Sequence, residues 1–415
     1  MASIAEITSL VKKAAKEAGF DLAGIAAVRD FPELDYFPQW IAKGHAGEMK
    51  YLEARDEAGR LKRASLKYAA PWARSVAVCA INYNTRQPYS TQVNDPERGW
   101  ISRYAWSQND YHESVMRRLR MVEARLRELA GSPAADAKSP ASTWRSVASA
   151  PPREGERNRA SAPVHKAGNG TQQNGALAAE DWCARDSEMQ PAETEVQTRC
   201  YVDTGPLVER VYAKYAGVGW IGKNTCILNQ KMGSWLFLGV ILTSLELAPD
   251  LAAPDRCGTC TRCIEACPTN ALVAPYQLDS NKCISYLTIE KRGDIPEAMR
   301  AGMGHHIFGC DICQEVCPWN HKAPATDAAD FQPRPELVNP ALDWLAEMSA
   351  EQFRASFRGS PVKRAKLSGI RRNAVISMGN SRNPRFRDIL QKLISDADPA
   401  VADHAAWALG QLEKG

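Results

Sequence analysis

The stretch that decides the fold is Cys257-Gly-Thr-Cys260-Thr-Arg-Cys263-Ile-Glu-Ala-Cys267-Pro268, with the spacing C-x2-C-x2-C-x3-C-P. Three cysteines spaced by two residues can curl round one cuboidal iron–sulfur cluster. The fourth, before proline, ligates the other cluster in two-cluster ferredoxins. A second run, Cys310-Asp-Ile-Cys313-Gln-Glu-Val-Cys317-Pro318, is one cysteine short of a full set, and Cys283 stands between the two runs. The spacing therefore predicts two clusters.

Exchange of the fourth ligand between the runs predicts which thiols share a cluster. One [4Fe–4S] cluster is expected to take Cys257, Cys260, Cys263 and Cys317. The other is expected to take Cys267, Cys283, Cys310 and Cys313. Zinc is the alternative, but structural zinc sites use paired C-x2–4-C elements, and triplet-like runs ending in Cys-Pro match them poorly. Four cysteines show no ligand spacing and are expected to be buried or incidental thiols: Cys79, Cys183, Cys200 and Cys226.

Composition bounds the class of protein. The chain has 415 residues, of which 44% are hydrophobic and 24% charged, which suits a globular protein of two or three domains. No apolar run reaches the ~18 residues of a membrane helix. Residues 1–20 are polar and amphipathic, without the apolar core of a signal peptide, so a cytoplasmic location is expected. Twelve cysteines in a reducing compartment favour metal over disulfides.

Apolar periodicity outlines the elements around the cysteine runs. Helices are predicted over 1–20, 110–129 and 207–216, and buried strands over 75–81 and 235–245. From about 131 to 197 the chain is rich in Ala, Ser, Pro, Gly, Asn and Gln, which predicts a disordered insertion. Residues 370–379 and 401–410 repeat one pattern, an apolar helix before a glycine stop. They indicate either a short HEAT-type repeat or an ordinary helical pair.

A basic segment precedes and enters this repeat. The net charge of +4 is too small to indicate nucleic-acid binding, so a basic site must show as a local cluster. Between residues 354 and 372 the chain has no acid and seven cations: Arg354, Arg358, Lys363, Arg364, Lys366, Arg371 and Arg372. Such a cluster suits phosphates. The alternative is a solvated basic face without a partner.

Further motifs carry a resemblance to a known family. They are Arg103-Tyr-Ala-Trp106, Asp110-Tyr-His112, Tyr201-Val-Asp-Thr-Gly-Pro-Leu-Val-Glu-Arg210, Gly217-Val-Gly-Trp-Ile-Gly-Lys-Asn-Thr225 and Cys283-Ile-Ser-Tyr-Leu-Thr-Ile-Glu290. Together with the eight cysteines, they resemble the epoxyqueuosine reductases over about 1–130 and 198–415. The resemblance implies an α+β or α/β multidomain protein. A cobalamin-binding domain related to reductive dehalogenases would span 1–248, a ferredoxin-like domain 249–325, and a HEAT-like domain 326–415.

The resemblance also implies an activity. Epoxyqueuosine at the wobble position of tRNA would be reduced to queuosine, using cob(I)alamin that is re-reduced through the two clusters. The protein would supply orientation and protons, since the cofactor carries the difficult chemistry. An external electron donor of the flavodoxin or ferredoxin type is expected, with no membrane partner. The enzyme is expected to be a monomer.

Asp203 is the expected proton donor. Opening an epoxide leaves an alkoxide that needs a proton, and a carboxylic acid whose pKa is raised by burial can supply one. On sequence alone, an aspartate in Asp-Thr-Gly is more often a turn or cap residue. The resemblance further assigns contacts with the cobalamin to Arg63, Asp203, Lys223, Asn224, Ile227, Ser234, Leu238, Ser285, Cys310, Asp311, Ile312 and Cys313. His112 becomes a candidate for the substrate pocket.

The chain departs from the family pattern at Ser102, and two other protein classes remain as alternatives. Ser102 stands before Arg103 where some family members place a cysteine above the cobalt, so no thiolate is available there. A cytosolic cobalamin-dependent reductase of the dehalogenase type, acting on a small molecule, would leave the basic segment unexplained. A plain electron carrier would leave Asp203 and its neighbours unexplained.

Overall fold

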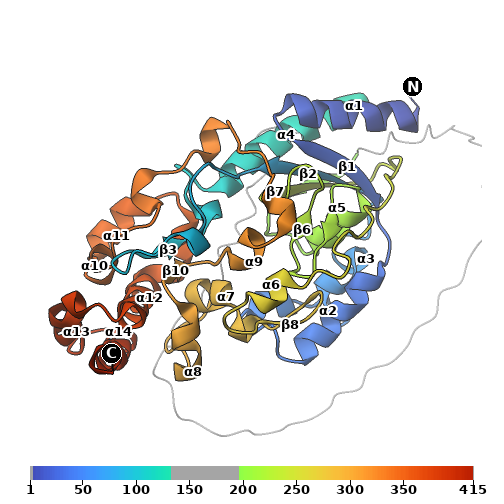
Figure 1. Cartoon of the computed structure of the whole chain (residues 1–415). Coiled ribbons are helices and arrows are strands. Elements are labelled where there is room, and N and C mark those ends of the chain that lie inside the picture. The colour runs from blue at the N-terminus through green and yellow to red at the C-terminus, as the bar shows by residue number, and fades with distance from the viewer. Residues whose placement is uncertain (1–2, 132–195, 415) are drawn as a thin grey trace, which may run out of the picture. The chain divides into compact units, whose positions relative to one another are not determined.

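A four-stranded antiparallel sheet lies at the centre of the N-terminal part of the chain (Figure 1). The computed structural model describes residues 3–131 and 196–414, so nearly all of the predicted insertion lies outside the described residues. The strand order is β1-β2-β7-β4. The bounds are Leu22–Ala27 for β1, Ser75–Asn82 for β2, Leu236–Thr243 for β7 and Thr198–Tyr201 for β4.

Strand β2 shows why the sheet needs cover on both faces. Its side chains alternate, so Val78 enters one apolar core and Cys79 the core on the opposite face. Every residue of β2 is buried. Antiparallel sheets often leave one face in water, whereas a continuous apolar strand requires packing on both sides. The strands predicted over 75–81 and 235–245 are confirmed as β2 and β7.

Helices cover the two faces of this sheet. Helices α1 (Ile4–Glu17) and α4 (Tyr111–Leu129) pack on one face, and α5 (Glu209–Tyr215) packs on the other beside α2 (Pro32–Ala42) and α3 (Leu66–Ala69). Ser3 and Glu6 form a capping box at the start of α1, and the Asp110 side chain caps α4. Because these caps satisfy backbone N–H groups that no helix bond reaches, they fix where both helices begin.

The cysteine-rich segment consists of short elements. The hairpin of β5 (Trp220–Ile221) and β6 (Ile227–Leu228) precedes it. The elements of the segment itself are α6 Arg262–Glu265, β8 Leu272–Ala274, β9 Gln277–Leu278, α7 Ile284–Ile289, α8 Glu297–Arg300, β10 His306–Phe308 and α9 Ile312–Glu315. Elements this short bury little apolar area, so their positions depend on contacts with the rest of the chain.

The C-terminal part is helical, with one correction to the sequence reading. The helices are α10 Leu342–Ala346, α11 Ala350–Ser356, α12 Lys366–Ser381, α13 Arg387–Leu393 and α14 Pro399–Glu413. The predicted glycine stops are wrong, because α12 continues past Gly379 and α14 past Gly410. A Cβ on Gly379 would lie 2.8 Å from the Cα of Ala408, so this glycine lets two helices approach closely.

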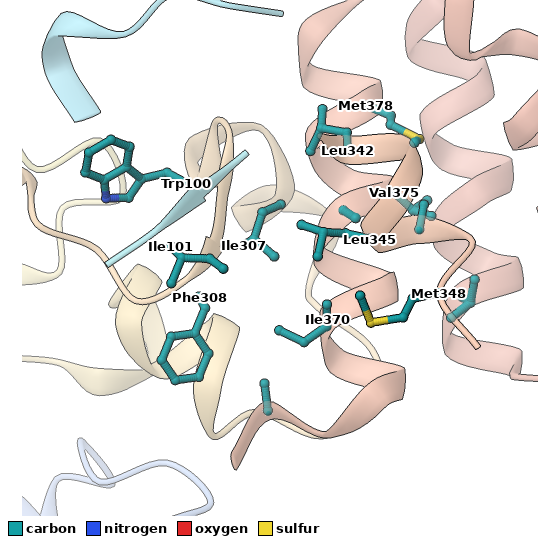
Figure 2. Close-up of a cluster of buried hydrophobic side chains, with 14 of the residues drawn as sticks. Trp100, Ile101, Ile307, Phe308, Leu342, Leu345, Met348, Ile370, Val375 and Met378 are labelled. Atoms are coloured by element: carbon teal, nitrogen blue, oxygen red, sulfur yellow. The ribbon is translucent and has the colours of Figure 1, made fainter. Parts of the chain in front are cut away.

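One buried core joins segments from all three predicted domains. Strand β3 (Trp100–Ile101) pairs in parallel with β10, and both pack against α10 and α12. Figure 2 shows Ile101 and Ile307 facing Leu345 and Ile370 across this core. The three-domain division stays a prediction, and its proposed boundaries run through a shared apolar core. None of the described helices is long and apolar enough to cross a membrane.

Candidate redox and substrate site

The first group of thiols contains a cysteine from each run. Burial raises the pKa of Cys263, and the neighbouring Cys257 and Cys260 raise it further. Burial also raises the pKa of Cys317 to about 11, with added contributions from Cys257 and Cys263. Cys317 therefore lies with the first run, although it belongs to the second. Cys257 and Cys317 pack against Trp220 and Trp319, which gives this group an apolar surround.

The second group takes its members from three segments. Burial raises the pKa of Cys310 well above its usual range, and Cys283 and Cys267 both add to the shift. The Cys313 pKa is also raised, with Cys310 and Cys283 among the causes. Each group thus holds four thiols, the number that one [4Fe–4S] cluster requires. The residues present fit two clusters with the ligand exchange expected from the spacing, and the assignment itself stays a prediction.

A ninth thiol, Cys226, lies beside the second group. A hydrogen bond with Cys313 is the largest influence on its pKa, which is lowered to about 7. Asn224 holds the two residues together: its Oδ1 accepts from the Cys226 N–H at 3.2 Å, and its Nδ2 donates to the Cys313 carbonyl at 3.1 Å. The sequence predicts a buried or incidental thiol at Cys226, because this cysteine has no ligand spacing. Its position on the β5–β6 hairpin brings it to the site.

Polar residues assigned to the cobalamin already hold the cluster segments. Lys223 Nζ donates to the carbonyls of Gly258 at 2.7 Å and Cys260 at 3.0 Å. Ser234 Oγ donates to Gln314 Oε1 at 2.8 Å and accepts from Asn320 Nδ2 at 2.8 Å. These bonds tie the sheet side of the molecule to both cluster-binding loops. Of the apolar candidates, Ile227 is buried, and Leu238 and Ile312 are partly exposed.

Backbone N–H groups surround the thiols of the second group. The N–H groups of Ser285 and Tyr286 bond to the Cys283 thiol and lower its pKa, which burial raises overall. The N–H of Ile312 does the same for Cys310. Hydrogen bonds to ligand sulfur tune the reduction potential of an iron–sulfur cluster. Ser285 and Ile312 can therefore act through their backbone, whatever their side chains contact.

Asp203 lies in the turn directly after β4, with its side chain exposed. Its φ of 55° is left-handed, a conformation that aspartate tolerates better than most residues. The Tyr111 hydroxyl donates to Asp203 Oδ2. Gly205 keeps the turn tight, since a Cβ there would lie 2.4 Å from the Leu207 side chain. The turn thus presents a carboxyl whose orientation is fixed by a phenol and by close packing.

Three tyrosines stand around this carboxyl. Burial raises the pKa of Tyr51, Tyr104 and Tyr111, and the charge of Asp203 raises each of them further. All three therefore stay neutral hydrogen-bond donors across the physiological pH range. Tyr111 stacks on Phe237 with ring centroids 4.2 Å apart, which fixes the phenol that meets Asp203.

Two arginines flank Tyr51 beside the same carboxyl. The guanidinium carbons of Arg63 and Arg364 lie 5.9 and 5.4 Å from the centre of the Tyr51 ring. Arg63 Nη1 also donates to the Tyr51 carbonyl at 3.0 Å, and burial lowers the pKa of Arg63. Arg364 forms an ion pair with Glu290 at 2.6 Å. The site around Asp203 is therefore rich in phenols and positive charge, as an anionic or hydroxyl-bearing substrate would require.

Ser102 belongs to the protein's internal contacts. Its Oγ donates to Asp311 Oδ1 at 2.5 Å, while the Trp100 Nε1 and the Arg103 N–H donate to Oδ2 at 3.2 and 2.8 Å. Asp311 is 1% exposed, so its carboxylate is buried and both of its oxygens accept hydrogen bonds from within the protein. They tie the loop of the second thiol group to the segment that starts at β3. The Asp311 side chain is thus fully used inside the protein.

Ser102→Ala should lower the free energy of unfolding by about 1–3 kcal/mol, because Asp311 Oδ1 loses its only hydrogen-bond donor among the described residues. Denaturant unfolding of the iron-loaded protein measures the loss. Ser381→Ala is the control, since that hydroxyl makes local bonds, donating to the Met378 carbonyl and accepting from the Asn383 N–H, and bonds no distant carboxylate among the described residues. Equal stability of the two variants would contradict the structural role of Ser102.

The basic segment is divided by the fold. Arg372 is 2% exposed and donates to the carbonyls of Leu287, Lys291 and Gly293, so it lies in the core and not on a basic surface. Arg371 pairs with Asp396 at 2.5 Å. Among the described residues, four of the seven cations are exposed and form no ion pair: Arg354, Arg358, Lys363 and Lys366. Counting charges along the sequence could not detect these tertiary partners.

His112 lies next to the Asp203 site. Its Nδ1 contacts Asp110 Oδ1 at 2.6 Å, and its ring stacks on Tyr111 with centroids 4.1 Å apart. Asp110 also caps α4 through the His112 N–H at 3.1 Å. The predicted substrate-pocket residue therefore adjoins the phenol that bonds Asp203, while part of its polar capacity is used at the helix start.

Comparisons with known proteins identify the class of the cysteine-rich segment. The two groups of four cysteines mark the chain as an iron–sulfur protein of the two-cluster class. Family models match three regions: "Epoxyqueuosine reductase QueG, DUF1730" over residues 63–139, "4Fe-4S double cluster binding domain" over 256–320, and "HEAT repeats" over 366–414.

Full-length relatives give the family. The chain is 32% identical over 406 residues to the epoxyqueuosine reductase of Xanthomonas campestris, covering 97% of this chain and 95% of that one. It is 35% identical over 337 residues to that of Synechocystis, covering 81% and 91%. This chain belongs to the epoxyqueuosine reductase family of oxidoreductases. The family resemblance predicted from the sequence motifs is confirmed.

Solved structures agree in fold. An epoxyqueuosine reductase crystallised with a tRNA-Tyr stem loop that carries epoxyqueuosine matches with a TM-score of 0.75 at 26% identity, covering 99% of this chain and 91% of that one. The Bacillus subtilis enzyme, at 25% identity and a TM-score of 0.73, is described with an aspartate-bearing catalytic loop swung out of its active site.

Proposed function

We propose that this chain reduces epoxyqueuosine to queuosine in tRNA, with Asp203 donating the proton that the opened epoxide oxygen requires. The observation that carries the proposal is the exposed Asp203 carboxyl in the same compact unit as two groups of four thiols. Tyr111 bonds this carboxyl, and Tyr51, against which Arg63 lies, is close to it. Family membership supplies the reaction, and a related enzyme binds a stem loop carrying this nucleoside.

A cobalamin is the proposed partner of the two clusters. When bound, it would supply the low-potential reducing chemistry that removes the epoxide oxygen, which no protein side chain provides. Part of the assigned set is free to hold it: Arg63, Leu238 and Ser285 are partly exposed. Partly exposed leucines on β7 suit an apolar ring. Lys223, Asn224 and Ser234 act indirectly by fixing the cluster loops.

The protein's own part in the reaction is acid chemistry and exclusion of water. Asp203 delivers the proton, and the Tyr111 hydroxyl orients its carboxyl. Arg63 and Arg364 stabilise negative charge that develops near Tyr51. An external one-electron donor of the flavodoxin or ferredoxin type would feed the thiol-bound clusters. A monomeric state and a cytoplasmic location stay predictions.

The four unpaired cations at α11 and just after it form the proposed tRNA contact. Removing Arg358 and Lys363 together by alanine should weaken tRNA binding and reduce the slope of log affinity against log salt by about 1.4–1.8, at roughly 0.7–0.9 per phosphate contact. Filter binding across a salt series measures the slope. Lys16→Ala is the control, because this exposed lysine lies on α1, well away from α11 in Figure 1. An unchanged slope would exclude this surface as the tRNA contact.

The deciding experiment is reconstitution of the reaction. The protein is purified without oxygen, loaded with iron, sulfide and cobalamin, and given a reduced viologen and tRNA that carries epoxyqueuosine. Mass spectrometry of the digested nucleosides should show loss of one oxygen, giving queuosine. If protein with both clusters and cobalamin leaves the nucleoside unchanged, the substrate assignment is wrong. If cobalamin does not bind, the cofactor assignment is wrong.

A further inference from the structure

Glu209 lies beside the proposed proton donor, and the proposed function gives it no role. It is the first residue of α5 and follows the Asp203 turn. Its carboxyl forms a hydrogen bond with the Asp203 side chain. Its Oε1 is closed off from solvent and has no hydrogen-bond partner among the described residues. A buried carboxyl oxygen without a donor is costly when ionised, which calls for a specific reason.

We propose that Glu209 and Asp203 form a carboxyl pair that shares one proton, in which Glu209 is a positioning residue that keeps Asp203 supplied with its proton. The inference rests on the proposed role of Asp203. Two carboxyl groups in hydrogen-bond contact cannot both be ionised without strong repulsion, so the pair retains a proton where a lone carboxyl would lose it. Burial is the largest cause that raises the pKa of Glu209, and Asp203 adds to it.

The charged groups that face the carboxyl pair do not remove its shared proton. Arg63 and Arg210 both lower the pKa of Glu209, but burial and Asp203 outweigh them. Tyr111 donates to Asp203 and keeps its own proton, because burial raises its pKa well above the usual range. Among the described side chains in contact with Asp203, Glu209 is therefore the one that can return a proton to it at neutral pH.

The proton balance is simple. The Asp203 carboxyl gives its proton to the oxygen of the opened epoxide and becomes a carboxylate. The proton on Glu209 moves along the hydrogen bond to Asp203, and one proton taken from solvent through the exposed Asp203 carboxyl restores the pair. No electron moves in these steps. The arrangement separates the acid that contacts substrate from the acid that is kept protonated by burial.

Infrared titration of the full-length protein tests the pair without turnover. Wild type should keep the carbonyl-stretch band of a protonated carboxylic acid, shifted in D2O, at pH 7–8. E209Q should lose that band, while E33Q should keep it, because burial raises the pKa of the Glu33 carboxyl but hydrogen bonds and the charge of Lys214 lower it overall and keep it ionised. E209D restores an acid and should recover part of the band. A band that is unchanged in E209Q would overturn the proposal.

Activity against pH gives a second readout. E209Q should keep its rate at low pH but lose it at lower pH than wild type, so the alkaline limb of kcat moves towards acid. If Asp203→Asn stays active, the proposed donor role fails. If Asp203→Asn is inactive but E209Q has the wild-type pH profile and band, only the pair fails. Should E209Q not fold, the band in Asp203→Asn should titrate away at lower pH than in wild type, and an unchanged titration would overturn the pair.

Discussion

Replacing Asp203 by asparagine should reduce the rate of epoxyqueuosine reduction about 10²–10⁴-fold, the usual contribution of a positioned general acid. Asparagine has nearly the same shape and can still accept the bond from Tyr111, so the turn after β4 should keep its conformation. It has no proton to give at neutral pH. The loss should therefore appear in kcat, with little change in KM for tRNA. Single-turnover assays with nucleoside mass spectrometry measure the rate.

The design separates a lost proton from a lost fold. Iron content, cobalamin content and tRNA affinity of Asp203→Asn should equal those of wild type. Asp30→Asn is the matched control, because Asp30 is an exposed aspartate whose carboxylate is already bonded by Ser65 and Lys67. It should leave turnover unchanged. Turnover of Asp203→Asn at the rate of this control would exclude Asp203 as the donor.

Replacing Cys267 by alanine should remove the second cluster and leave the first, although Cys267 lies within the first cysteine run. The reason is its position with Cys283 and Cys310 in the structure. Iron should fall from about eight to about four per chain. Turnover should fall to background, because the electron path to the substrate site is broken.

Electron paramagnetic resonance decides which cluster is lost. Cys267→Ala should give the same reduced spectrum as Cys310→Ala, and Cys317→Ala the same as Cys257→Ala. Cys200→Ala, a thiol in the sheet, should keep both signals and serves as the control. If Cys267→Ala instead matched Cys257→Ala, each run would bind its own cluster and the predicted ligand exchange would be wrong.

Regular patterns allowed much of the fold to be predicted from the sequence. The strand at 75–81 and the helix at 110–129 follow from apolar spacing, because their neighbours along the chain share one face. The cysteine spacing works for the same reason: ligands two residues apart must curl round something small. Local geometry alone carries these inferences.

Contacts between distant segments could not be predicted from the sequence. Arg372 reads as one more surface charge until three backbone carbonyls of the cluster segment are seen to accept from it. Cys226 has no spacing to mark it and reaches Cys313 through a hairpin and an asparagine. The sequence gives Glu209 no role, because the residues beside it in the chain do not show that its carboxyl contacts Asp203. Each of these contacts joins residues that the fold brings together.

The pairing of β3 with β10 has a consequence for how the chain is made. Trp100 leaves the ribosome long before His306, its partner across the strands, and longer still before Val401, which closes the same core. Until then these apolar residues lack their native contacts. Apolar residues of the N-terminal half therefore stay exposed to solvent, and prone to aggregation, for most of translation. The core is completed when the ribosome releases the last helix. We therefore expect chaperone supply and translation speed to affect the yield of folded protein.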